Sequence, residues 1–118
     1  MCIRDSNEGD WGRAFQDSDM PNIAGQGFTG IRIPVRFSSH ALTDAPYTID
    51  ASFMTRVRHV VDLAVANHLN VTLDMHHYVE LFSDPTGQAP RFASLWAQVA
   101  DAFKDEPASV YFLSLIHI

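Results

Sequence analysis

Short apolar runs alternate with longer stretches of helical spacing along this chain of 118 residues. Residues 28–35 and 110–112 are mostly apolar, whereas apolar and polar side chains alternate over residues 71–76. Both patterns are typical of β-strands that are buried on at least one face. The sequence therefore predicts three strands, separated by segments that are long enough to hold a helix.

Apolar residues recur every three or four positions over 53–64, which predicts a helix. Asp50 is a residue type that caps helix N-termini, and residues 67–68 end the periodic pattern. A second apolar stripe follows Pro90, which is suited to the first turn of a helix. We expect this second helix to end before Pro107.

Two successive strand–helix–strand units imply a parallel α/β sheet. A doubly wound sheet and a (β/α)8 (TIM) barrel both fit this order. Long polar segments, which we interpret as loops, follow the first two strands at residues 38–48 and 79–89, while the turns after the helices are short. Loops of that kind build the active face of a barrel, and a complete barrel needs about 250 residues. The predicted fold is a partial (β/α)8 barrel.

Composition places the chain among ordinary globular proteins, with 47% hydrophobic and 19% charged residues. The net charge of −6 disfavours nucleic acid and anionic membranes as partners. Apolar runs of 18 residues are absent from the sequence, so no membrane span is predicted. A neutral sugar polymer fits this charge, as do most metabolites.

The two ends of the chain read as translated DNA adapter rather than as protein. Residues 1–6 and residues 113–118 correspond to the two orientations of one transposon-end sequence that is used to prepare sequencing libraries. We therefore expect residues 7–112 to be the native part, an N-terminal portion of a barrel. Cys2, the single cysteine, would then be adapter, so no disulfide or thiol chemistry is predicted.

Polar side chains share one face of the two central predicted strands. Strand alternation puts Arg32 on the face opposite the apolar side chains, and it puts Asp74 and His76 on the same face of the next strand. An arginine within an apolar strand is expected to be buried and therefore to need an anionic partner, for which Asp74 is the candidate. Two interpretations remain open: a structural ion pair, or an arginine that fixes a catalytic carboxylate.

His76 and His77 lie at the end of the second strand, where alternation points them to opposite faces. They cannot chelate one metal ion, and no zinc-type spacing occurs, so neither a metal nor a cofactor is expected. Substrate contacts in a cleft and ordinary surface histidines both fit the pair. Trp11 is equally open, because it could line a sugar-binding surface or cover the core. Glu80 and Asp84 are expected to be solvated loop charges.

Several motifs together resemble glycoside hydrolase family 5, and the likeness is greatest to bacterial endo-β-1,4-glucanases. The motifs, in order, lie at residues 8–12, 27–40, 74–78, 84–85, 91–96 and 111–112. The resemblance implies a retaining mechanism and a fragment that spans roughly strands 2 to 4 of the barrel. It also implies that Arg32 contacts the nucleophilic glutamate, that His76 contacts substrate beside the cleaved bond, and that His77 binds sugar hydroxyls. Its partner would be a polysaccharide or oligosaccharide.

The resemblance breaks off after residue 112, where the family continues into an Asn-Glu-Pro motif that holds the acid/base glutamate. This chain has neither that residue nor the later nucleophile, so the isolated chain is predicted to be inactive and poorly folded. The alternatives are a β-mannanase or dual-specificity glycanase, a non-catalytic carbohydrate-binding barrel, and an unrelated α/β enzyme. Export or a periplasmic location would suit the parent protein, and its oligomeric state is left open.

Overall fold

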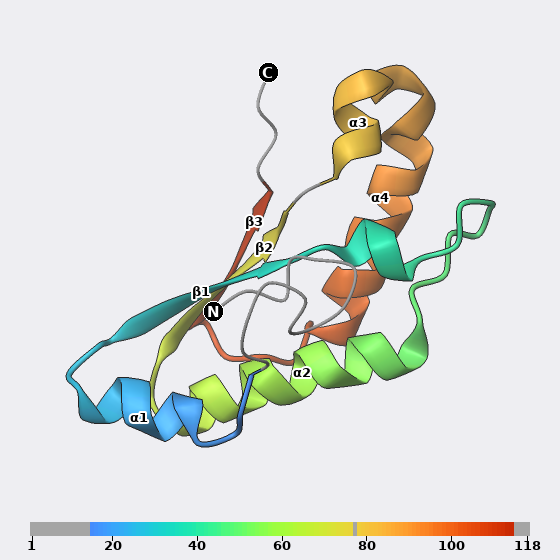
Figure 1. Cartoon of the computed structure of the whole chain (residues 1–118). Coiled ribbons are helices and arrows are strands. Elements are labelled where there is room, and N and C mark those ends of the chain that lie inside the picture. Colours follow the sequence, from blue (N-terminus) through green and yellow to red (C-terminus); the bar gives the residue numbers. More distant parts are fainter. Residues whose placement is uncertain (1–14, 77, 115–118) are drawn as a thin grey trace.

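A parallel three-stranded sheet forms the centre of the fold in the computed structural model, which describes residues 15–76 and 78–114. The strands are β1 (Gly30–Val35), β2 (Asn70–Met75) and β3 (Val110–Ser114), and they lie side by side in chain order (Figure 1). The register pairs Pro34 with Asp74 across β1 and β2. All three predicted strands are confirmed, and so is the partial barrel architecture.

One helix precedes β1, and the others lie in the crossover connections that a parallel sheet requires. The helices are α1 (Asp19–Gly25), α2 (Ala51–Ala66), α3 (Val79–Ser83) and α4 (Pro85–Ala102), with a 3-10 turn η1 (Phe37–His40) after β1. The side chain of Asp50 accepts a hydrogen bond from the Ser52 amide at 2.9 Å, so the predicted cap of α2 is confirmed. Asn67 ends α2, also as predicted.

Two predictions about the segment after β2 were wrong. The expected loop at 79–89 contains α3 and the first turn of α4, and α4 begins at Pro85, so that Pro90 lies inside the helix. The reason is the cap: the Asp84 carboxylate accepts a hydrogen bond from the Gly87 amide at 3.0 Å. Pro85 then occupies the first helical position, where a missing N–H costs nothing.

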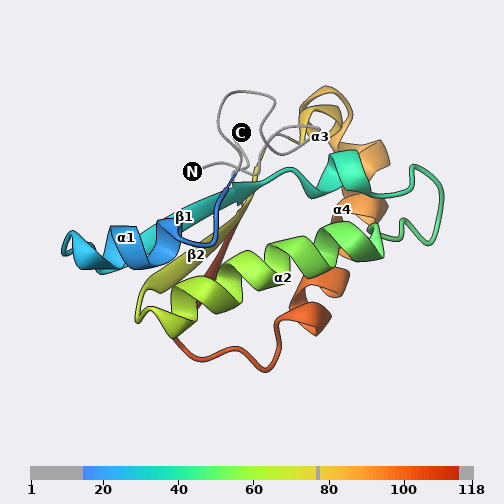
Figure 2. The ribbon, with the colours of Figure 1, turned by 60° about the horizontal axis from the view of Figure 1, so that its bottom comes forward.

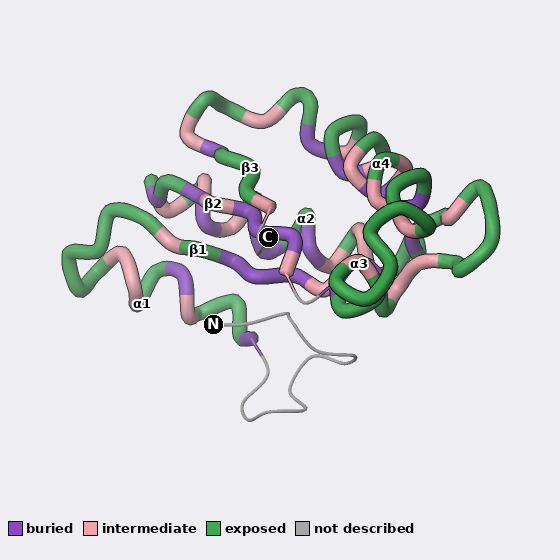
Figure 3. Tube along the Cα trace, turned by 90° about the horizontal axis from the view of Figure 1, so that it is seen from above, coloured by how far each residue is buried: buried purple, intermediate pink, exposed green. Residues whose placement is uncertain are grey.

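The core lies between the sheet and the two long helices α2 and α4, which cover the same side of the sheet (Figures 1 and 2). Ile33, Val35, Val71 and Leu73 are fully buried there, so the predicted apolar face is confirmed. Trp96 packs against this core, as expected from its place in the helical stripe. The last three residues of β1 and of β2 are buried, whereas β3 at one edge of the sheet is mostly exposed (Figure 3). Within the described ranges, no helix is both long and apolar enough to cross a membrane.

Candidate functional site

Arg32, Asp74 and His76 lie together on the face of the sheet opposite α2 and α4. One carboxylate oxygen of Asp74, Oδ2, lies 3.0 Å from His76 Nδ1 and 3.6 Å from Arg32 Nε. The parallel register produces this arrangement, because it sets Arg32 beside Thr72 and Asp74 two positions further along β2. The shared face predicted from strand alternation is therefore confirmed.

The depth of burial differs from the prediction. The Arg32 side chain is 53% exposed, while the Asp74 side chain is fully buried at 0%. Arg32 is the third residue of β1 and leaves the sheet on the side without helices, so its guanidinium stays in contact with solvent. The group that needs a partner is the carboxylate rather than the arginine.

Asp74 is only partly satisfied by these two contacts. Among the described residues, its second oxygen, Oδ1, is buried without a hydrogen-bond partner. A buried unsatisfied acceptor costs about 1–3 kcal/mol. The charge at this position is therefore not explained by the stability of the fold.

Two predicted site residues, Trp11 and His77, lie outside the described residues. Of the loop carboxylates, Asp84 serves as the N-cap of α4, and Glu80 lies exposed in the first turn of α3. The expectation of solvated loop charge fits Glu80, but Asp84 has a structural role. No group of three or more His, Cys, Asp or Glu residues in the described part could hold a metal ion.

Sequence reasoning missed Arg91, a buried arginine on α4 with 5% exposure. Its Nε donates to the Leu42 carbonyl at 3.1 Å, and one terminal nitrogen donates to the carbonyls of Ser38 at 2.8 Å and Ala41 at 3.2 Å. The guanidinium also lies 5.5 Å from the centre of the Tyr78 ring. Arg91 thus contacts the segment that follows β1 and a residue that follows β2.

Tyr78 is buried beside Arg91, and its hydroxyl donates to Gln88 Oε1 at 2.9 Å. Burial raises the pKa of this hydroxyl above its usual value, and the positive charge of Arg91 offsets part of the rise. Further along α4, Gln98 donates to the Tyr47 carbonyl at 2.9 Å and accepts from the Ile49 amide at 2.8 Å. Helix α4 therefore fixes the whole connection between β1 and α2.

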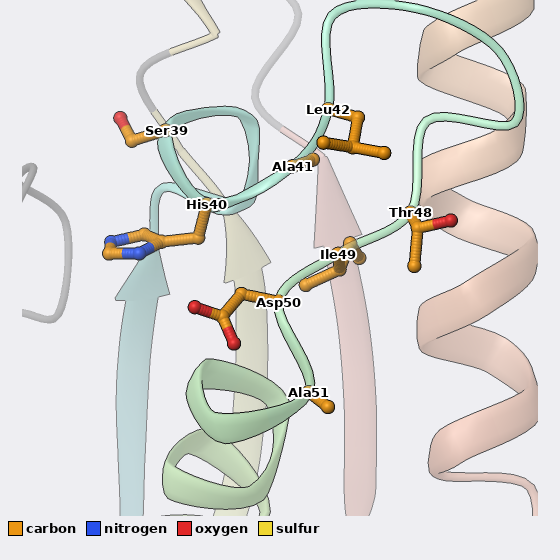
Figure 4. Close-up of a pocket in the computed structure, with 8 residues that line it drawn as sticks. All are labelled: Ser39, His40, Ala41, Leu42, Thr48, Ile49, Asp50 and Ala51. Carbon is orange, nitrogen blue, oxygen red and sulfur yellow. The ribbon is translucent and has the colours of Figure 1, made fainter.

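An open pocket of about 530 Å³ lies where this connection meets the start of α2 (Figure 4). The residues that line it are Ser39, His40, Ala41, Leu42, Thr48, Ile49, Asp50 and Ala51. The His40 ring stacks on Phe53 at 3.6 Å, and the Asp50 carboxylate caps α2, so both have structural roles. Since Asp74 and its two partners do not line this pocket, we place the candidate site at the strand ends instead.

A parallel α/β layer with helices on one face and a charged cluster on the other is the arrangement expected of part of a (β/α)8 barrel. The family model described as "Cellulase (glycosyl hydrolase family 5)" matches residues 3–113. The chain belongs to glycoside hydrolase family 5.

Curated relatives include endoglucanase H of Acetivibrio thermocellus, 31% identical over 89% of this chain, and endoglucanase B of Paenibacillus lautus, 34% identical over 80%. The chain spans only 12% and 18% of the lengths of these two proteins. Among solved structures, Thermotoga maritima Cel5A in complex with mannotriose superposes with a TM-score of 0.93. It is 39% identical, and the match covers 96% of this chain and 37% of that one.

Proposed function

We propose that the protein carrying this sequence hydrolyses β-1,4-linked glucan with retention of configuration. Two of its relatives are endoglucanases, and structures of Thermotoga maritima Cel5A contain mannotriose or cellobiose as substrate. The observation that supports the proposal best is the Asp74 carboxylate, which contacts Arg32 of β1 and His76 just after the end of β2 on one face of the sheet. In a parallel barrel, that end of the strands is where substrates bind.

Retaining hydrolysis requires two carboxyl groups about 5–5.5 Å apart, one as nucleophile and one as acid/base. Glu80 and Glu106 do not meet this need, because Glu80 lies exposed on α3 and Glu106 lies beyond the end of α4. The proposal assigns both catalytic groups to other parts of the complete protein. The 118-residue chain alone is therefore expected to release no reducing sugar.

In this proposal, Arg32 holds the nucleophilic carboxylate as an anion. A guanidinium can donate two parallel hydrogen bonds to one carboxylate, and such charge-assisted bonds are roughly twice as strong as neutral ones. The 53% exposure of the side chain leaves room for a second carboxylate beyond Asp74. His76 and His77 would bind sugar hydroxyls near the cleaved bond, and Trp11 would stack on a sugar ring.

The test is hydrolysis of carboxymethyl cellulose and of mannan by the complete protein and by its Arg32→Lys and Arg32→Met variants. We expect glucan cleavage, a fall in kcat of roughly 100-fold for Arg32→Met, in line with the loss of one preorganised electrostatic contact, and a smaller loss for Arg32→Lys. Arg58→Met is the matched control, since Arg58 is an exposed arginine on the far side of the sheet.

Each outcome has a clear meaning. Full activity of Arg32→Met would remove Arg32 from the site. Sugar binding without cleavage by the complete protein would favour a non-catalytic carbohydrate-binding barrel. Cleavage of mannan in preference to glucan would assign the site to a β-mannanase, and equal cleavage would indicate dual specificity.

A further inference from the structure

Asp74 is the most deeply buried charge near the strand ends, and its two contacts are unequal. The distance from its Oδ2 to His76 Nδ1 is 3.0 Å, a hydrogen-bond length, whereas the distance to Arg32 Nε is 3.6 Å. A residue present only to balance Arg32 would be expected to contact the arginine more closely. Since the Arg32 side chain is 53% exposed, solvent already screens its charge.

The hydrogen bond to Asp74 determines which nitrogen of the His76 ring carries the proton. In a neutral histidine one ring nitrogen donates and the other accepts, while an ionised carboxylate only accepts. A hydrogen bond between Asp74 Oδ2 and His76 Nδ1 therefore needs the proton on Nδ1. The neutral ring then has its lone pair on Nε2, the nitrogen remote from Asp74.

We infer that Asp74 is a positioning residue that holds His76 in the Nδ1–H tautomer and fixes the plane of its ring, so that Nε2 accepts a hydrogen bond from a sugar hydroxyl. Arg32 supplies the opposite charge for the buried carboxylate. This assignment rests on the proposed function for the identity of the hydroxyl. The tautomer itself does not depend on catalysis.

The burial of Asp74 supports a positioning role. In the described part of the chain, its Oδ1 has no hydrogen-bond partner, so the ionised side chain is a poor choice for stability alone. In histidines generally, a hydrogen bond from one ring nitrogen, often to a carboxylate, determines which nitrogen carries the proton. The same carboxylate also contacts Arg32, so one side chain orders both groups of the candidate site.

The experiment is nitrogen NMR of the complete protein labelled with 15N-histidine, with the His76 signals assigned through a His76→Gln variant. At a pH where the ring is neutral, we expect His76 to show a protonated Nδ1 and an unprotonated Nε2. Asp74→Leu removes the acceptor, and the ring should then change to the Nε2–H form. Asp74→Asn keeps a carbonyl acceptor of the same shape and should retain part of the Nδ1–H signal.

His59 provides an internal control, because it contacts a carboxylate through Nε2, whereas His76 does so through Nδ1. Its Nε2 lies 3.0 Å from Asp17 Oδ1 on the exposed surface. The same reasoning predicts the Nε2–H tautomer for His59, unaffected by changes at Asp74. Asp17→Asn should alter only the His59 signals. In hydrolysis assays, Asp74→Leu should lower kcat/KM by roughly 10–100-fold, as changes to such supporting groups do, and Asp17→Asn should have no effect.

An Nε2–H tautomer of His76 in the unaltered protein would overturn the inference, and this measurement does not require any variant to fold. An Nδ1–H tautomer that persists in Asp74→Leu would also overturn it, since another group would then hold the proton. A correct tautomer in a protein that cleaves no glycan would leave the inference intact and reject the proposed function.

Discussion

Arg91→Met tests whether α4 holds the segment that follows β1. The substitution keeps an unbranched apolar side chain but removes the donors for the carbonyls of Ser38, Ala41 and Leu42. Each hydrogen bond contributes about 1 kcal/mol net, and hydrogen bonds to charged groups contribute about 1.5–3 kcal/mol. Loss of the contact with the Tyr78 ring removes about 0.5–1 kcal/mol more. Relief of the buried charge offsets part of this loss, so we expect a net cost of about 3 kcal/mol.

The assay is thermal and urea unfolding of the complete protein, followed by limited proteolysis. At about 2–4 °C per kcal/mol for a large domain, the melting temperature should fall by about 6–12 °C. Protease cleavage within residues 41–48 should become faster. Arg91→Lys should lie between the wild type and Arg91→Met, since a lysine keeps the charge but loses the fork geometry. A cost for Arg91→Met no larger than that of the exposed control Arg58→Met would refute this reasoning.

Two further changes test the pair formed by Asp62 of α2 and Glu106, which follows α4, and the core. Burial, followed by a hydrogen bond and charge repulsion from Asp62, raises the pKa of Glu106. Glu106 therefore binds its proton more tightly in the folded protein than in the unfolded chain. The protonated carboxyl stabilises the fold at low pH, and this stabilisation is lost as the pH rises through the folded pKa. Glu106→Gln mimics the protonated form and should raise the free energy of unfolding at pH 7 by about 0.5 kcal/mol, a size typical of partly exposed charges. In acid the substitution should have no benefit. Equal effects in urea unfolding at both pH values would contradict this. Leu73→Ala, at a fully buried position, should lower the unfolding free energy by about 3 kcal/mol, whereas a cost as small as that of an exposed leucine would show that β2 is not central to the core.

Local patterns predicted most of the fold. Helix α2 could be bounded from Asp50 to Asn67, because a side-chain cap and an apolar period act within a few residues of each other. The start of α4 could not be predicted, since Pro90 is a residue type that favours the first turn of a helix but lies in the second turn. The actual start depends on Asp84, whose capping geometry needs a glycine three residues later and is hard to distinguish from a polar loop.

The site was predictable to the level of which residues share a face, and no further. The period of two in a β-strand sets the side of the sheet for Arg32 and Asp74, but burial depends on what covers that side, which is not a local property. The burial of Arg91 was likewise not predictable from local sequence. The residue lies one turn before the buried Leu95 on α4, yet its carbonyl acceptors lie 49 to 53 positions away in the sequence. Only the tertiary fold shows that this charge is solvated by the backbone.

The same difference in burial makes Asp74 more important to the site than Arg32. A charge at a fixed place in a parallel sheet is costly in proportion to its burial, and at 0% exposure Asp74 has the largest cost of the three groups in the site. It is partly compensated by a histidine two residues away and by an arginine on the neighbouring strand. Because the register of β1 and β2 is set by their apolar side chains, the apolar face of the sheet determines the geometry of the polar one. A one-residue slip of β2 would bury His76 in the core and separate the cluster, so the packing of Leu73 and the alignment of the site depend on each other.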